Sequence, residues 1–143
     1  MATGNSFAAD LWAHILNNAP LPGLGDPSGC QPSLVPGVLS VALHTADPGD
    51  AGFQTTNEVF YTGYTRVQVA RNGTGWNIVN KVATPTYNLD FPSREDLGTV
   101  INATFFSVGY GTRIIARGAL TPLIPINQNT IPRIKTTSTL TFV

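Results

Sequence analysis

The residues best suited to chemistry gather in one short run, HTADPGD, near the end of the first third of the chain. His44 could serve as an acid or base, and the carboxylates of Asp47 and Asp50 could join it in catalysis or in holding a metal ion. A metal site needs three or four converging ligands. The two aspartates flank Pro48-Gly49, where aspartates commonly cap the backbone amides of a turn. We therefore predict a structural turn here, with no catalytic residues and no metal.

The remaining candidates for chemistry have simpler explanations. Asp90, Glu95 and Asp96 surround the segment FPSRE, which resembles a loop that enters a short helical turn with Ser93 as its cap. Cys30 has no base near it in the sequence. The sequence contains no P-loop, no G-x-S-x-G and no dinucleotide fingerprint. It predicts a protein that is not an enzyme and that has no cofactor and no small-molecule substrate.

Charge is scarce in this sequence. Charged residues make up 11% of the 143 residues, against about 25% in an average soluble domain. Thr, Asn, Ser and Gln fill the polar positions instead. Such a surface is easily desolvated and suits large permanent contacts, although a monomer of low charge is the alternative.

The few charges are unevenly distributed. Residues 1–65 contain five acids and no Lys or Arg, whereas residues 66–143 contain eight bases and three acids, so the two parts carry about −5 and +5. This division favours contact between the two parts, either within one chain or between neighbours. The bases are scattered singly, which predicts no nucleic-acid binding.

Features of targeting are also absent from the sequence. The apolar runs are far shorter than the roughly 20 residues that span a bilayer, so we expect no membrane contact. The first residues, MATGNSFAAD, do not resemble a signal peptide, and the lone cysteine allows no intrachain disulfide. We expect a protein that is made in a reducing cytoplasm.

A helix is predicted over residues 6–18, with Ser6 as its N-cap. Apolar residues recur on one side of this helix, at Phe7, Ala8, Leu11, Trp12, Ile15 and Leu16. Asn17-Asn18 and the prolines that follow end it. A single helix of this length is marginal in water. We therefore expect Phe7, Leu11, Trp12 and Ile15 to dock onto a sheet face or a neighbouring subunit.

Residues 19–37 are rich in proline and glycine, which favours an extended connection. This arm either carries the helix onto a neighbour or wraps its own domain. We predict two parts, a helix with its arm at residues 1–36 and a β domain at residues 37–143.

Short strands are predicted throughout the β domain. They cover residues 37–45, 64–71, 76–79, 87–91, 99–108, 112–120 and the tail TTSTLTFV. In the first strand, Leu39, Val41 and Leu43 alternate with the more polar face of Ser40, Ala42 and His44. Gly109-Tyr110-Gly111 joins two of the strands as a hairpin would. The pattern predicts an all-β fold, an antiparallel sandwich or barrel-like domain with one N-terminal amphipathic helix and a Pro/Gly-rich arm.

Three pieces of the sequence carry a family resemblance: VALHTADPGD at residues 41–50, GYTR at 63–66 and GALT at 118–121. With them the chain resembles small bacteriophage virion proteins of the tail-fibre-like or capsid cement (decoration) type. The resemblance runs from the helix to the last strand, and it implies a structural role in the virion.

The leading hypothesis is a capsid cement protein on the capsid surface of the virion. Its partners would be the major capsid protein and neighbouring copies of itself, since low charge and a long arm suit a repetitive interface. The alternative is a tail-fibre or receptor-binding module that recognises a saccharide of the host surface, with Trp76 either exposed for that purpose or buried in the core. An enzyme such as a depolymerase is the third hypothesis, but the sequence offers no acid/base pair for catalysis.

The charge division suggests which residues make the contact. Asp47, Asp50 or Glu58 of one copy would meet Arg113 and Arg117 of a neighbouring copy, or the charged parts would meet the shell. Strict alternation along their strand places Arg113 and Arg117 on the same face.

Overall fold

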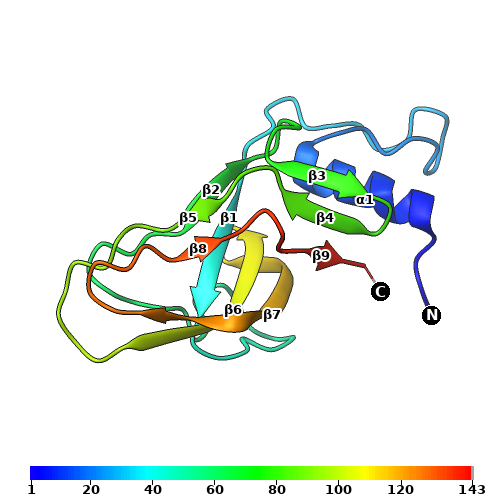
Figure 1. Cartoon of the computed structure of the whole chain (residues 1–143). Helices are drawn as coiled ribbons and strands as arrows, with labels where there is room; N and C mark the ends of the chain where they lie inside the picture. Colours follow the sequence, from blue (N-terminus) through cyan, green and yellow to red (C-terminus); the bar gives the residue numbers. More distant parts are fainter. Residues whose placement is uncertain (143) are drawn as a thin grey trace. The chain divides into compact units, whose positions relative to one another are not determined.

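The structure is a computed structural model and describes residues 1–142. It contains one helix and nine strands over that range (Figure 1). They are α1 (Asn5–Asn17), β1 (Val38–His44), β2 (Val67–Ala70), β3 (Trp76–Val79), β4 (Val82–Pro85), β5 (Leu89–Asp90), β6 (Ile101–Tyr110), β7 (Arg113–Ile126), β8 (Arg133–Ile134) and β9 (Leu140–Thr141).

The chain forms two compact units, each built from separate stretches of sequence. Unit 1 consists of residues 1–39, 69–88 and 135–142, and unit 2 consists of residues 40–68 and 89–134. Each unit therefore combines residues that lie far apart in the sequence.

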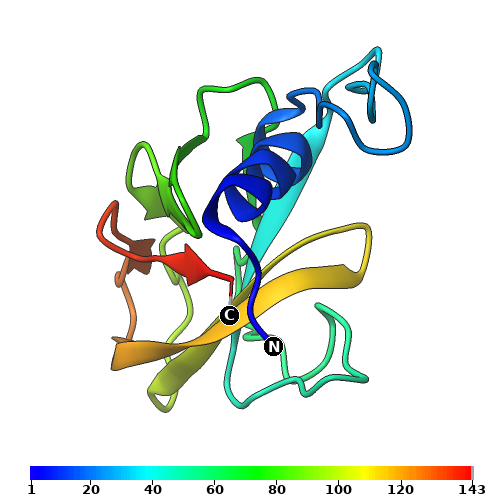
Figure 2. The same cartoon turned by 90° about the vertical axis from the view of Figure 1, so that its right-hand side faces the viewer.

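Unit 1 contains the helix and a three-stranded antiparallel sheet of order β3-β4-β9. The helix packs against β3, as Figures 1 and 2 both show. It buries Ala8, Trp12 and Leu16, which are spaced by four residues and so lie on one side of the helix. Part of the predicted apolar stripe, with Trp12 at its centre, thus packs within its own unit.

The helix begins earlier than predicted. Gly4 is the N-cap, and its carbonyl already accepts the first helical hydrogen bond from Ala8 at 2.9 Å. Ser6 lies inside the first turn, so its prediction as the N-cap is wrong. At the other end Asn18 adopts the left-handed conformation and its N–H donates to the carbonyl of Ala13, which ends the helix as the Asn pair predicted.

The arm that follows lies along its own unit. Asn18 and Ser33 exchange two hydrogen bonds of 2.9 and 2.8 Å, and Leu21 pairs with Cys30 across the loop between them. The arm therefore folds back on itself, and its contact with a neighbour stays a prediction.

Unit 2 is built around the β6–β7 hairpin, which continues into β1 in a sheet of order β2-β1-β6-β7. The predicted hairpin is confirmed, with its turn at Gly111-Thr112. The strand β7 continues to Ile126, six residues past the predicted end at residue 120. A smaller pair, β5–β8, lies in the same unit.

The strand β1 is buried on both faces, which the alternating pattern did not predict. Ser40 and His44, expected on a polar face, are buried with their apolar neighbours. The reason is the long connection after β1, whose residues Gln54 and Thr56 hydrogen-bond to this face and cover it.

The predicted fold class is confirmed. The described chain is mostly β, its sheets are antiparallel and its helix is N-terminal, consistent with an all-β sandwich-like domain. The predicted helical turn at FPSRE is wrong, because the backbone of Arg94 pairs with Asn129 and Thr130 instead. The predicted last strand is shorter, and Val143 lies outside the described residues. The division at residue 36 stays a prediction.

Candidate functional site

The histidine of the HTADPGD run is a core residue. His44 is fully buried, with Nδ1 2.8 Å from the carbonyl oxygen of Thr56 and Nε2 2.8 Å from the hydroxyl of Ser107. A carbonyl only accepts, so Nδ1 carries the proton, and Nε2 accepts from Ser107. Burial lowers the pKa of His44 below its ordinary value of 6.5, which keeps the ring neutral.

The same buried face holds a glutamine that sequence reasoning missed. Gln54 is fully buried, and its Oε1 accepts from the hydroxyl of Ser40 at 2.6 Å and from the guanidinium of Arg66 at 3.3 Å. Its Nε2 donates to the carbonyl of Ser40 and to Ser107. A polar loop residue carries no signal of burial in the sequence. Here its hydrogen bonds are satisfied, as a structural role requires.

Two residues of the GYTR piece bind Glu58, which precedes this piece in the sequence. Arg66 makes a two-bond contact with Glu58, at 2.7 and 2.9 Å. The hydroxyl of Tyr64 donates to the same carboxylate and accepts from the backbone N–H of Leu43. Burial raises the pKa of Tyr64 well above its ordinary value. Tyr64 therefore contacts β1 directly, and Arg66 contacts it through Gln54.

The acidic turn pairs with β7 of its own chain. Arg117 donates to Asp47 at 2.7 Å and to Asp50 at 2.8 Å. The amide of Gly49 and then Arg117 lower the pKa of Asp47. The predicted attraction between acidic and basic parts thus operates within one chain at these residues. The side chain of Asp50 remains 98% exposed, and a partner contact there stays a proposal.

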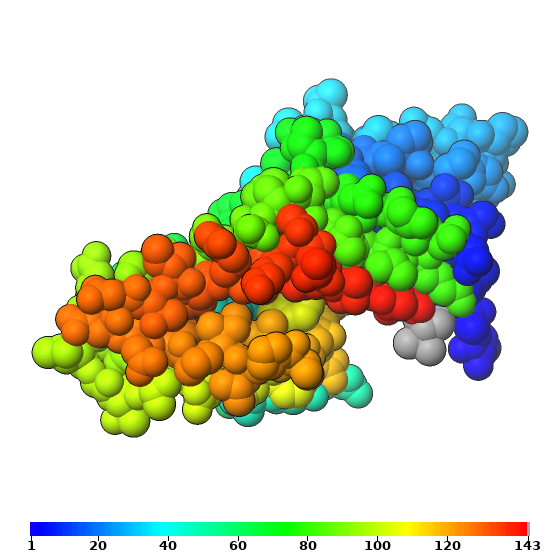
Figure 3. Space-filling view, in the orientation of Figure 1, coloured from blue at the N-terminus to red at the C-terminus, as the bar shows by residue number. Residues whose placement is uncertain are grey.

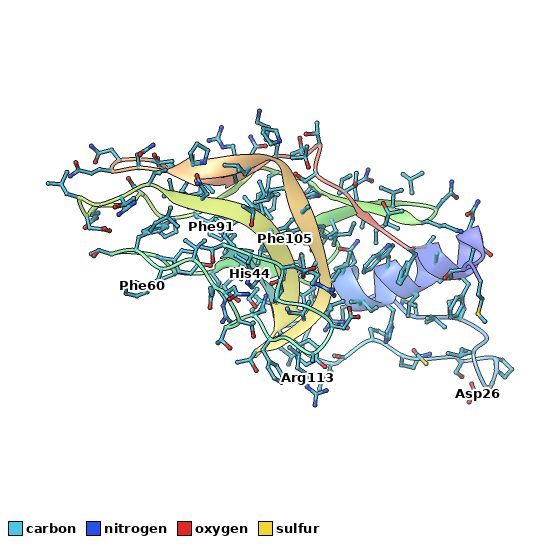
Figure 4. All side chains as sticks on the ribbon, turned by 90° about the horizontal axis from the view of Figure 1, so that it is seen from below. Asp26, His44, Phe60, Phe91, Phe105 and Arg113 are labelled. Carbon is cyan, nitrogen blue, oxygen red and sulfur yellow. The ribbon has the colours of Figure 1, made fainter. Side chains whose placement is uncertain are left out.

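Arg113 and Arg117 do not share a face, contrary to the prediction. Arg113 pairs with Tyr110 of β6 and Arg117 pairs with Ser107, so four positions on β7 span only three on β6. The extra residue is a β-bulge at Ile115, which reverses the alternation between the two arginines. Figure 4 shows Arg113 projecting away from the body of unit 2.

Two tryptophans considered for contact with partners belong to the core of unit 1. The indole Nε1 of Trp12 donates to the carbonyl of Lys81 at 3.0 Å, and its ring packs at a tilt against that of Phe142, with centroids 4.1 Å apart. Trp76 is also buried, so of its two interpretations the one as a core residue holds and the one as an exposed saccharide platform does not. Of the other helix residues, Leu11 and Ile15 are half-buried and Phe7 is exposed.

Sequence reasoning also missed an arginine that holds the helix. Arg71 donates to the carbonyls of His14 and Ile15, at 2.9 and 2.6 Å, and to that of Pro36 at 3.0 Å. The last carbonyls of a helix have no hydrogen-bond partners within the helix and carry partial negative charge. A guanidinium supplies both the missing donors and a positive charge.

A group of exposed apolar side chains that internal packing does not explain lies at one end of unit 2. Three loops meet there, residues 59–63, 92–100 and 127–132, and we call them the loop tip. Four of its apolar side chains are exposed, namely Phe60 (84%), Leu97 (82%), Ile131 and Val100. Figure 3 shows the second and third of these loops side by side, in yellow-green and orange.

The loop tip is tied together by a buried arginine. Arg94 is 3% exposed and donates to the carbonyls of Thr99 and Ile126 and to the carboxylate of Asp96. Asp96 in turn accepts from the backbone N–H of Thr62 at 2.9 Å. This ion pair links two of the loops and the end of β7, and backbone hydrogen bonds of Arg94 to Asn129 and Thr130 join the third loop.

Phe60 is exposed from a fixed backbone. Its neighbours Val59 and Tyr61 are both buried, and the hydroxyl of Tyr61 donates to the carbonyl of Pro92 at 2.7 Å. Figure 4 shows Phe60 at the end of the unit, while Phe91 lies inside. The ring is therefore held outward by the fold.

Within residues 1–142, no group of three or more His, Cys, Asp or Glu side chains is placed to hold a metal ion. The helix of that range is too short and too polar to cross a membrane.

The family described as "Podophage GP4 fiber I protein gp80" matches residues 31–141. The match covers more than half of the chain and includes all of unit 2. The chain belongs to this family. The HTADPGD and GYTR pieces both lie inside the matched range, so the resemblance to phage virion structural proteins is confirmed at that level. No curated protein matches the chain.

Proposed function

We propose that this member of the podophage fibre I family is a non-catalytic structural subunit of a phage fibre. The observation that carries the proposal is the family match over residues 31–141, since the family is described by a fibre protein. The geometry supports it, because the residues suited to chemistry hold the fold together. His44, Glu58 and Arg66 are all engaged in internal hydrogen bonds.

A cement role on the capsid surface, with the major capsid protein as partner, is the second candidate. The observation that favours it is the apolar arm of unit 1. Leu34 is fully exposed, and Val35 and Val38 are exposed beside it. Apolar side chains in a row along an extended segment suit burial against a large partner.

Deleting the gene from the phage separates the two roles. A fibre subunit predicts particles whose shells resist heat as the wild type does but which adsorb poorly to host cells. A cement protein predicts normal adsorption and shells that break at lower temperature. Particles complemented with the wild-type gene are the control. Deletion particles that adsorb normally would contradict the fibre proposal.

A further inference from the structure

We propose that Asn72 is a site of spontaneous deamidation, at which the backbone nitrogen of Gly73 displaces ammonia from the side-chain amide. Asn72-Gly73 is the one Asn-Gly pair of the sequence, and it lies in the turn after β2, in unit 1. The reaction requires a free backbone nitrogen next to a polarised amide carbon. The proposal is independent of the proposed function, because it concerns the chemistry of a single turn.

The attacking nitrogen of Gly73 is accessible. Within residues 1–142, no hydrogen bond between backbone groups involves Asn72 or Gly73, and both residues are exposed. A Cβ atom built at Gly73 would meet nothing within 4 Å. With neither a side chain nor a neighbouring segment over it, this N–H can lose its proton to water, and the nitrogen can then approach Cγ of Asn72.

The side-chain amide of Asn72 is polarised by two donors. Its Oδ1 accepts from the backbone N–H of Thr74 at 3.2 Å and from the hydroxyl of Thr74 at 2.6 Å. When the nitrogen of Gly73 attacks Cγ, negative charge develops on this same oxygen. Two donors already aimed at it stabilise that charge, as the donors of an oxyanion hole do. They also hold the amide on the side of the chain that leads to Thr74, where the attacking nitrogen lies.

The two ends of this turn are fixed. The N–H of Arg71 donates to the carbonyl of Gly37 at 3.1 Å, and the hydroxyl of Thr86 donates to the carbonyl of Thr74. Only the tip of the turn is therefore free of backbone hydrogen bonds. The arrangement around Asn72 is a property of the folded chain, which favours a reaction between groups already held close together.

The reaction balances with water as the sole co-reactant. The nitrogen of Gly73 gives its proton to water and forms a bond to Cγ of Asn72, while the bond from Cγ to Nδ2 breaks and Nδ2 leaves as ammonia with a proton from water. Water then opens the resulting succinimide ring at either carbonyl, which yields aspartate or isoaspartate. Either product adds a negative charge to a chain whose eight acids and eight bases otherwise cancel.

Two other asparagines provide internal comparisons. Asn80 is exposed in the turn after β3, but the next residue is Lys81, whose side chain crowds the attacking nitrogen. Asn102 has the same spacing to a threonine, Thr104, but it lies within β6 and pairs with Pro125. We expect Asn72 to react while these two asparagines stay intact.

Incubation of the purified full chain in buffer, followed by peptide mass spectrometry, tests the proposal. The peptide with Asn72 should gain the mass that separates Asp from Asn, and the intact protein should gain negative charge in isoelectric focusing. The rate should be higher at pH 8.5 than at pH 6.5, because the attack requires the deprotonated nitrogen. Thr74→Val should slow the reaction by roughly three- to tenfold, since it removes a hydrogen bond from Oδ1 in a turn open to water.

Thr84→Val is the matched control. It removes a threonine hydroxyl from the same unit, and the structure shows no hydrogen bond of that hydroxyl among the described residues. It should leave the rate at Asn72 unchanged, and circular dichroism should show both variants folded as the wild type is. A wild type in which Asn72 reacts no faster than Asn80 would overturn the proposal. A Thr74→Val chain that reacts as fast as Thr84→Val, or faster, would overturn it as well.

Discussion

At the scale of single residues, His44 shows how a reactive side chain becomes part of a core. Both ring nitrogens are engaged, and the connection after β1 shields them from water. The sequence pattern placed His44 on a polar strand face, and apolar and more polar residue types do alternate along this strand. Gln54 and Thr56 cover that face, and the local sequence pattern of a strand does not predict such a contact.

A pH dependence of stability follows from this burial. Because the pKa of His44 is lowered in the folded state, the unfolded chain binds the proton more readily. The contribution of neutral His44 is therefore complete above about pH 6.5 and is lost as the pH falls below it, by up to about 1.4 kcal/mol per pH unit.

Urea unfolding at pH 7.5, 6.5 and 5.5 measures this effect. The wild type should lose stability below pH 6.5. His44→Gln should be less stable at pH 7.5 but should show a shallower loss on acidification, while His14 remains in both proteins. Equal pH slopes for the two proteins would show that His44 is not the titrating group.

At the scale of elements, β7 shows what alternation can and cannot predict. Its hairpin partner and its approximate start were predictable from the turn residues and the two flanking apolar runs. The bulge at Ile115 was not, because the extra residue appears only in the register with β6. It separates Arg113 from Arg117, and only Arg117 then reaches the acidic turn.

The outer edge of β7 is also interrupted. β7 ends the order of its sheet, and its register with β6 breaks a second time between Ala119 and Ile124. Pro122 lies in that interval and offers no N–H to a further strand. These breaks leave β7 poorly suited to uncontrolled pairing with other edges.

The end of α1 yields a prediction about an element. Arg71→Ala should destabilise the protein by about 2 kcal/mol, since it removes charged donors from the carbonyls of His14, Ile15 and Pro36. Lys81→Ala is the control, because it removes a positive charge from the same unit without removing a side-chain hydrogen bond that the structure shows. Equal urea midpoints for the two variants would mean that Arg71 does not stabilise the helix end.

At the scale of the whole molecule, the charge division has a partly internal explanation. Arg66 binds Glu58 and Arg117 binds Asp47 and Asp50, so bases of the second part meet acids of the first part within one chain. Composition predicted that such contacts would form, but it could not say whether they would lie within a chain or between chains. The exposed apolar side chains of the loop tip come from loops that are not contiguous in the sequence.

The structural role in a phage was predictable because HTADPGD and GYTR are short contiguous motifs. The structure explains why several important residues lie so close together in the sequence. One motif supplies the buried His44 and the turn that pairs with Arg117, and the other supplies Tyr64 and Arg66 around Glu58. Such motifs report how the fold is held together. They do not report which side chains lie on the surface, and the sequence pattern did not indicate the exposure of Phe60 and Leu34.

The central claim, that the chain is a fibre subunit, is tested most directly by imaging intact phage particles at subunit resolution and fitting this chain into the density. The account predicts that unit 2 fits density in fibres that project from the particle, and that this density is missing from particles lacking the gene. Density for the chain spread over the capsid shell, with unchanged fibres in the deletion particles, would contradict the claim and establish the cement role.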